Sequence, residues 1–221
     1  MRSLVLVLVS AVLLLAGCAA LPTDARTPAP SSAAPSPSAT AASGCPVEDI
    51  PAPDPDAPFN QPLHDELVAM LARDQAERMG TAETEEGDEV RTERLGEIVA
   101  EYGWPSIPMV GKDAEDAAWA IAQHSDLDPD FQCAALEYLR EAVDAGVASP
   151  GNLAYLEDRV AVSAGEEQVY GTQIECGPDG APRPTTPIAD PDGVEQRRAD
   201  AGLQSLADYY AELAVICAQE G

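Results

Sequence analysis

Residues 112–124, KDAEDAAWAIAQH, form the stretch that decides the fold, because apolar side chains lie on nearly every side of it. The apolar residues are Ala114, Ala117, Ala118, Trp119, Ile121 and Ala122. A helix without a wide polar face is usually buried at the centre of its domain. The stretch therefore predicts a helical domain built around residues 112–124.

Helical periodicity continues on both sides of this segment. Apolar residues recur at three- and four-residue steps in 63–79 and 88–102, which predicts two helices before the central one. Two more begin at Asp128-Pro129 and Ser149-Pro150, where proline suits the first helical position. The last helical pair is expected at 194–201 and 206–217, separated by Gly202.

The segment 168–174 alternates in polarity and predicts a β-strand. A turn at Pro178-Asp179-Gly180 follows, and the prolines of the return arm confine that arm to a sheet edge. The fold class is therefore mainly α (α+β). We expect a single helical domain of about six to seven helices with a small β-hairpin, over residues 59–221.

The amino-terminal 58 residues differ in composition from this domain. Residues 1–17 have one basic residue, Arg2, before an apolar run that is too short to span a bilayer, as in a secretory signal peptide. The tetrapeptide 15–18, Leu-Ala-Gly-Cys, resembles the lipobox of bacterial lipoproteins. This resemblance implies cleavage before Cys18, a lipid on its sulfur and attachment to the outer face of the cytoplasmic membrane. Residues 18–58 are rich in Pro, Ala, Ser and Thr, which predicts a disordered tether.

The net charge of −27 limits the kinds of molecule that the protein can bind. Such a surface repels phosphate backbones, so no nucleic-acid partner is expected. The acids are dispersed, the cysteines lack metal-site spacing, and the chain has two histidines, so no metal or cofactor is expected. Beyond the membrane contact through Cys18 we expect a monomer whose ligand or protein partner the sequence does not name.

The chain has five cysteines, and four remain if Cys18 carries lipid. An even number in an exported chain favours disulfides over a metal site. Cys217 is in phase with the apolar stripe of the last helix, and Cys176 ends the predicted strand. Cys133 lies off the main stripe of its helix, within reach of the tether. We therefore predict the pairs Cys176–Cys217 and Cys45–Cys133.

Five short segments with polar residues follow one another along the chain. They are Gly103-Trp104-Pro105, Gln123-His124-Ser125-Asp126, Leu156 to Val160 with Asp158-Arg159, Gln168 to Gln173 with Tyr170-Gly171-Thr172, and Arg197-Arg198. Together they resemble a bacterial family of unknown function over about residues 63–210. The resemblance implies a fold and a candidate site but no activity. It adds Arg197 and Arg198 to the candidate binding residues.

Helical angles separate the polar residues of the segment after Ser149-Pro150. At 100° per residue Arg159 borders the core face set by Leu156, whereas Asp158 points almost directly away from it. Arg159 is therefore a candidate anion-binding group. The alternative is a structural ion pair with one of the many acids.

His124 lies in the last turn of the central helix, with Asp126 close enough to pair with it. The two are candidates for a catalytic acid or base, and a histidine that caps the helix is the alternative. On the predicted strand, Tyr170 and Gln173 are candidate binding residues. Gly171 either clears space for a ligand beside Gln173 or admits a packed neighbour.

Two functions follow from these residues. The first is an extracytoplasmic binding or interaction lipoprotein without catalysis. The alternative is a hydrolase-like enzyme that uses His124 and Asp126, with Arg159 and Gln173 holding the substrate. The lack of a recognised nucleophile motif in the sequence favours the first.

Overall fold

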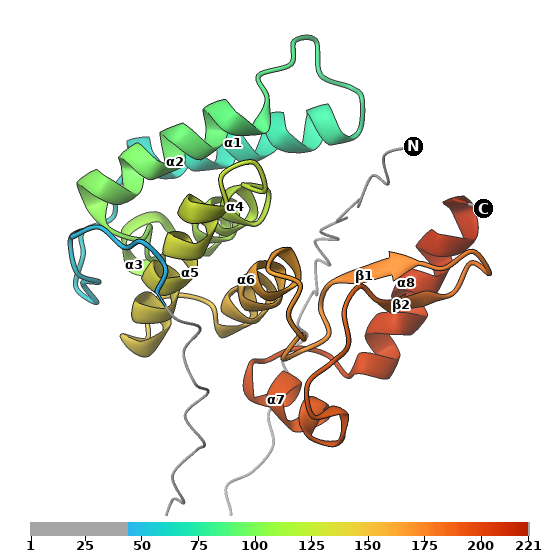
Figure 1. Cartoon of the computed structure of the whole chain (residues 1–221). Helices are drawn as coiled ribbons and strands as arrows, with labels where there is room; N and C mark the ends of the chain where they lie inside the picture. Colours follow the sequence, from blue (N-terminus) through green and yellow to red (C-terminus); the bar gives the residue numbers. More distant parts are fainter. Residues whose placement is uncertain (1–43, 221) are drawn as a thin grey trace, which may run out of the picture. The chain divides into compact units, whose positions relative to one another are not determined.

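The computed structural model describes residues 44–220. The expected signal peptide (1–17), the expected lipid site Cys18 and the tether as far as residue 43 lie outside the described residues. Within residues 44–220 the chain forms eight α-helices and one two-stranded antiparallel sheet (Figure 1). The predicted fold class, mainly α with a small β-hairpin, is therefore confirmed.

The helices follow the predicted periodic segments closely. Their bounds, with those of the two strands, are α1 Gln61–Arg78, α2 Asp88–Tyr102, α3 Ile107–Val110, α4 Lys112–Gln123, α5 Pro129–Asp144, α6 Pro150–Ser163, β1 Ile174–Cys176, β2 Pro182–Pro184, α7 Val194–Asp200 and α8 Leu206–Glu220. Helix α3 was not predicted, because a single turn is too short to show a period.

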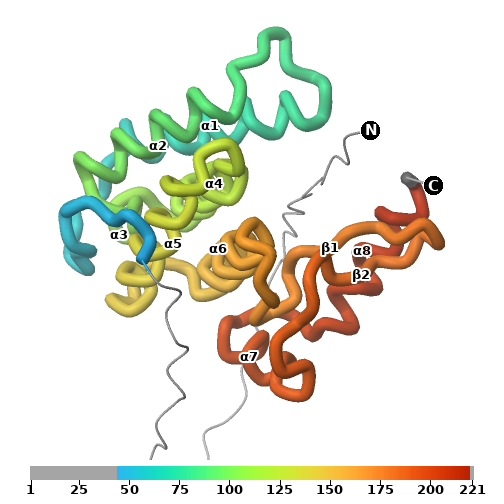
Figure 2. The backbone as a smooth tube through the Cα atoms, in the orientation of Figure 1, coloured from blue at the N-terminus to red at the C-terminus, as the bar shows by residue number. Residues whose placement is uncertain are grey.

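Helix α4 is the centre of the fold, as its composition predicts. It packs against α1, α2, α3, α5 and α6, and in Figure 2 it lies below α1 and α2 and above α6. Nine of its residues are buried, among them the polar Glu115 and Gln123. The apolar core contains side chains of α1, α2, α4 and α5, together with Leu156 of α6. Each fully buried leucine in such a core contributes about 1.5–3 kcal/mol.

Short polar side chains begin three of these helices. Asn60 accepts a hydrogen bond from the Leu63 N–H (3.2 Å), Asp128 from the Phe131 N–H (3.0 Å) and Ser149 from the Asn152 N–H (3.3 Å). A proline occupies one of the first helical positions in each case. The cap oxygen accepts from an N–H group that a helix start leaves unpaired, and proline has no such group, so these boundaries are encoded locally.

The predicted strand at 168–174 is wrong in its extent. Strand β1 begins only at Ile174 and pairs with β2 in the register Ile174–Pro184, Glu175–Arg183 and Cys176–Pro182. Residues 168–173 form an irregular loop, in which Gln168 alone makes an isolated bridge, to Ile188. The expected turn at 178–180 is present between the strands.

The last part of the predicted tether belongs to the folded unit. The compact unit begins at Gly44, not at residue 59. We call residues 45–59 the N-terminal strap. Cys45 is bonded to Cys133 of α5, the Tyr138 hydroxyl accepts from the Glu48 N–H (2.8 Å), and Ile50 packs against the core. A composition typical of disorder is here overridden by a covalent bond and by specific contacts.

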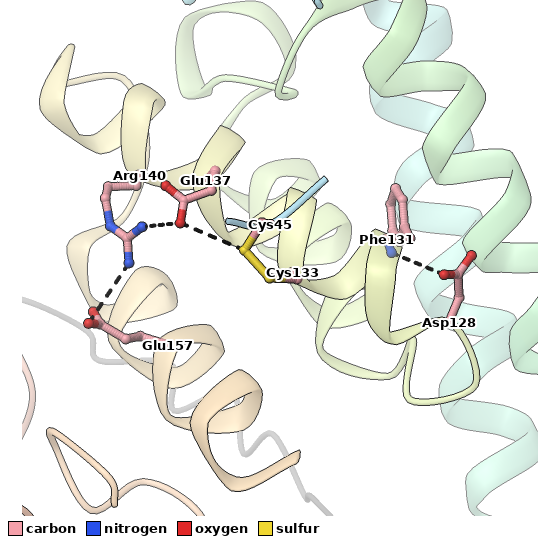
Figure 3. Close-up of a disulfide and its surroundings, with 7 residues drawn as sticks. All are labelled: Cys45, Asp128, Phe131, Cys133, Glu137, Arg140 and Glu157. Carbon is pink, nitrogen blue, oxygen red and sulfur yellow. Dashed lines mark hydrogen bonds and ion pairs between the residues drawn. A yellow bond between two sulfur atoms is a disulfide. The ribbon is translucent and has the colours of Figure 1, made fainter. Parts of the chain in front are cut away.

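Both disulfides join the pairs that the sequence predicts, Cys45–Cys133 and Cys176–Cys217. Figure 3 shows the first pair on α5, next to Glu137 and to Arg140, whose guanidinium lies between Glu137 and Glu157. The second pair connects β1 to α8. The two bonds therefore fix the strap to the helical bundle and the hairpin to the last helix.

Candidate functional site

Asp158 of α6 is the centre of the polar region, although the helical angles predicted that it faces away from the core. Its carboxylate accepts hydrogen bonds from the backbone N–H groups of Val169 (2.6 Å), Tyr170 (3.0 Å) and Thr172 (2.8 Å). The Thr172 hydroxyl donates a fourth, at 2.9 Å. Asp158 is fully buried, because the loop formed by residues 168–173, the motif loop, covers this side of α6.

The electrostatics of Asp158 combine two opposed effects. Burial raises the pKa of its carboxyl, and the N–H groups of Thr172, Tyr170 and Val169 act in the opposite direction. Burial is the larger effect, so the pKa of Asp158 is raised overall, although three N–H groups converge on the carboxylate. An internal carboxylate therefore occupies the position that a bound anion could otherwise take.

The Gln168 side chain makes hydrogen bonds that hold the motif loop together. Its amide nitrogen donates to the carbonyl oxygens of Gln173 and Thr186, both at 3.0 Å, and its amide oxygen accepts from the Gln173 N–H at 2.8 Å. These contacts replace the ladder hydrogen bonds of a strand. For this reason the alternating pattern at 168–174 does not produce an extended strand.

Both the backbone conformation and the packing at residue 171 require a glycine. Its φ is +67°, a left-handed conformation that side chains rarely adopt. A Cβ atom there would lie 2.6 Å from Cδ1 of Ile188 and 3.2 Å from Cδ1 of Leu206. The hypothesis that Gly171 clears space for a ligand is therefore wrong, and the space is taken by packed side chains of the protein itself.

Arg197 and Arg198 of α7 donate to the carbonyl groups of this region. Arg197 bonds to the carbonyl oxygens of Val169 (2.9 Å) and Ala189 (2.6 Å). Arg198 bonds to those of Tyr170 and Gln204, both at 2.8 Å, and is buried with its guanidinium 5.1 Å from the centre of the Tyr209 ring. The two arginines thus donate to the carbonyl groups of Val169 and Tyr170, whereas Asp158 accepts from the N–H groups of the same loop.

Arg159, Asp126 and Gln173 come together beside the motif loop. Arg159 makes a bidentate ion pair with Asp126, in which its Nε lies 2.9 Å from Oδ1. A third N–H of Arg159 donates to the Gln173 side-chain oxygen at 3.3 Å. The structural ion pair, the alternative to an anion-binding role, is the arrangement present.

His124 does not pair with Asp126 as expected. Its Nδ1 lies 3.0 Å from Oδ1 of Asp74 and 3.1 Å from Nε of Arg78, both on α1. Asp74 is fully buried, and burial opposes its ionisation. The hydrogen bonds and charges of His124 and Arg78 outweigh burial and lower the pKa of Asp74 to about 2. His124 thus belongs to an ion-pair network between helices.

Glu115 is a buried polar residue that was not among the predicted site residues. Its carboxylate is fully buried in α4, where it accepts from the Asn152 amide at 3.0 Å and from the Ser149 N–H at 3.4 Å. Burial, with the nearby charge of Asp116, raises its pKa to about 7. The available signal was an acid within a helix that is apolar nearly all round.

A hollow of about 390 Å³ lies between the N-terminal strap, α2 and α5, and none of the candidate catalytic or binding residues lines it. Its lining residues are Pro46, Glu48, Ile50, Gly96, Val99, Ala100, Asp128, Asp130, Phe131, Ala134 and Tyr138. Figure 3 shows Asp128 and Phe131 on the α5 side. The hollow was not predicted, because the composition of residues 46–50 is typical of a disordered tether.

Residues 44–220 contain neither a metal-type cluster of three or more His, Cys, Asp or Glu side chains nor a helix long and apolar enough to cross a membrane. These features define a small, mainly α, disulfide-linked domain with an internally bonded polar motif. Residues 61–216 match a family of unknown function, DUF6624, and the chain belongs to this family. Searches among curated proteins and among solved structures found no match.

Proposed function

We propose that this protein is an extracytoplasmic lipoprotein, attached to the outer face of the bacterial cytoplasmic membrane through a lipid on Cys18, and that its helical domain is a binding module. The observation that carries the proposal is the pairing of the cysteines in two disulfides. The two disulfides account for all the cysteines of the sequence except Cys18. Disulfides form and persist in oxidising compartments, so the pairing supports export and leaves Cys18 available for lipid.

The geometry of the polar residues counts against the hydrolase alternative. The hydrolase alternative requires His124 and Asp126 to act together. His124 instead contacts Asp74 and Arg78, and Asp126 contacts Arg159. The side chains of Gln168, Arg197 and Arg198 donate hydrogen bonds to backbone carbonyl groups and so stabilise the fold. We therefore place the binding surface elsewhere on the domain.

The lipid is tested in bacteria fed an alkyne-bearing fatty acid. The full chain should become labelled and sediment with membranes, whereas Cys18→Ala should lose the label and accumulate with its signal peptide uncleaved. Cys45→Ala/Cys133→Ala is the matched control, since it also removes cysteines from the amino-terminal half but keeps Cys18. Equal labelling of the wild type and the Cys18→Ala variant would refute the proposal.

The orientation is tested by protease treatment of intact spheroplasts. A protein on the outer face of the membrane is digested without lysis, whereas a cytoplasmic control protein is protected. Digestion of this chain only after lysis would contradict an extracytoplasmic position.

A further inference from the structure

The hollow beside the N-terminal strap combines an apolar floor with an acidic rim. Val99, Ala134 and Tyr138 are buried beneath it, and Ile50 and Phe131 are half-buried at its sides. Three exposed carboxylates stand at its edge, those of Glu48, Asp128 and Asp130. None of the described residues that line the hollow is basic.

Hydrogen bonds and a disulfide hold the rim of the hollow in place. The Tyr138 hydroxyl of α5 accepts from the Glu48 N–H at 2.8 Å and lies 3.4 Å from the Glu48 carbonyl oxygen. The Cys45–Cys133 disulfide fixes the same stretch of strap to the same helix. Asp128 is fixed by its bond to the Phe131 N–H, at 3.0 Å. These bonds fix the Glu48 backbone and the Asp128 side chain at the edge of the hollow.

We infer that this hollow is a docking surface for a basic amphipathic segment of a partner protein, an inference that rests on the proposed binding role. Charge complementarity selects the occupant: a lysine or arginine side chain places its aliphatic stem on the apolar floor and its charged end among the three carboxylates. The surface beyond the hollow is also apolar in part. Val47, between two lining residues, is 55% exposed, and Leu127, next to Asp128, is 70% exposed. This extension fits a peptide segment better than a free amine.

The test is a binding titration of the full chain, purified in a non-ionic detergent, against a fluorescent peptide of leucine and lysine at helical spacing. Glu48→Lys/Asp130→Lys should weaken binding by about tenfold, since two attractive contacts become repulsive. Neither side chain makes a hydrogen bond within the described residues, and the cap residue Asp128 is unchanged. The matched control is Glu83→Lys/Glu85→Lys, which alters net charge equally in the exposed loop between α1 and α2 and should leave affinity close to wild type.

A second variant fills the hollow without changing charge. Gly96 of α2 lines it, and a Cβ there would make an ordinary 3.6 Å contact with the Phe131 ring. Gly96→Leu should keep the fold, since leucine favours a helix more than glycine does. It should weaken peptide binding by about tenfold or more, as expected for loss of a buried anchor contact. Gly96→Ala, which adds only the Cβ, is its control.

Four results would overturn the inference. They are no binding to the wild type, equal losses in the rim and control charge variants, undiminished binding to Gly96→Leu, and equal binding of a peptide in which glycine replaces leucine. Displacement of the peptide by spermidine at comparable concentration would assign the hollow to a free polyamine instead and would also overturn the inference. The peptide titration does not depend on Cys18, so failure of the lipid proposal and failure of this inference are distinguishable.

Discussion

The helical bundle of α1–α6 and the segment after it, residues 168–220, are stabilised in different ways. In the bundle the buried side chains are mostly apolar and form one continuous core. In residues 168–220 the buried hydrophobic side chains are Val194 and Cys217, against four buried polar ones, Gln168, Thr172, Gln173 and Arg198. The second region is therefore held by hydrogen bonds from side chains to backbone and by the Cys176–Cys217 bond.

This difference has energetic consequences. Apolar burial is non-directional and spreads over many side chains, so the loss of one contact leaves the others in place. A buried hydrogen-bonding group instead depends on one partner, and removal of that partner leaves it unsatisfied at a cost of about 1–3 kcal/mol. We therefore expect a single substitution that removes a hydrogen-bond partner of residues 168–220 to act as strongly as a large truncation in the core.

The largest effect is expected from Asp158→Ala. It leaves the N–H groups of Val169, Tyr170 and Thr172 without their acceptor, so we expect a loss of about 3–5 kcal/mol in the free energy of unfolding. Urea denaturation measures this loss, and hydrogen exchange should locate it at residues 168–190. Leu139→Ala, a core truncation in α5, is the comparison and should cost about 2–5 kcal/mol. A loss under about 1 kcal/mol for Asp158→Ala would show that the motif loop does not depend on this carboxylate.

The second largest effect is expected from Cys176→Ala/Cys217→Ala. Removal of a disulfide from a small domain costs about 2–4 kcal/mol, and here little apolar burial compensates. Limited proteolysis should then cut the hairpin and α8 while α1–α6 stay protected. In the matched variant Cys45→Ala/Cys133→Ala, cleavage should move to the strap. Identical cleavage patterns for the two variants would remove the proposed difference between the regions.

A smaller effect concerns Glu115, one of the buried polar residues of the bundle. Its pKa is raised to about 7 in the folded protein, so between its unfolded value of 4.5 and about 7 the folded state keeps a proton that the unfolded state loses. The contribution of Glu115 to stability should therefore fall by about 2–3 kcal/mol as the pH rises through this window. The difference between wild type and Glu115→Gln, followed by chemical denaturation at pH 5 and pH 8, isolates this change. Parallel pH profiles of the two proteins would contradict it.

The smallest effect is expected from Gly171→Ala. The substitution places a Cβ 2.6 Å from Ile188 and strains a residue with φ of +67°, for a loss of about 1–3 kcal/mol. Gly165→Ala is the control, since its φ is +74° but no atom lies within 4 Å of the added Cβ. Thermal unfolding of both variants separates strain from packing. Equal losses would mean that the contact with Ile188 and Leu206 contributes nothing.

Local signals were enough to predict much of the bundle. Asp128-Pro129 and Ser149-Pro150 begin helices because the cap side chain and the proline act within one turn. The apolar character of residues 112–124 predicts a central helix because a helix that is apolar on nearly all sides needs packed neighbours on all of them. The disulfide pairs could be predicted because Cys217 and Cys133 have defined positions on helices whose periods are clear.

The candidate site could be predicted only in part. The pieces around Asp158, Tyr170 and Arg198 do meet in space, but a helical angle gives the direction of a side chain and not what covers it. Asp158 points away from the bundle core and is nevertheless buried, because the motif loop packs on that side of α6. His124 and Asp126 are neighbours in sequence, yet they bond to different helices, α1 and α6.

The sequence by itself therefore determined where the helices other than α3 lie, which of them is central and which cysteines pair. The tertiary structure alone decided the partners of Asp158, His124 and Arg159, the irregular path of residues 168–173 and the existence of the hollow under the strap. The physical reason is one of range. Helix propensity, capping and periodic burial act over a few residues. The acceptor for a buried N–H group or the partner of a buried charge is set by chain segments that only the fold brings together.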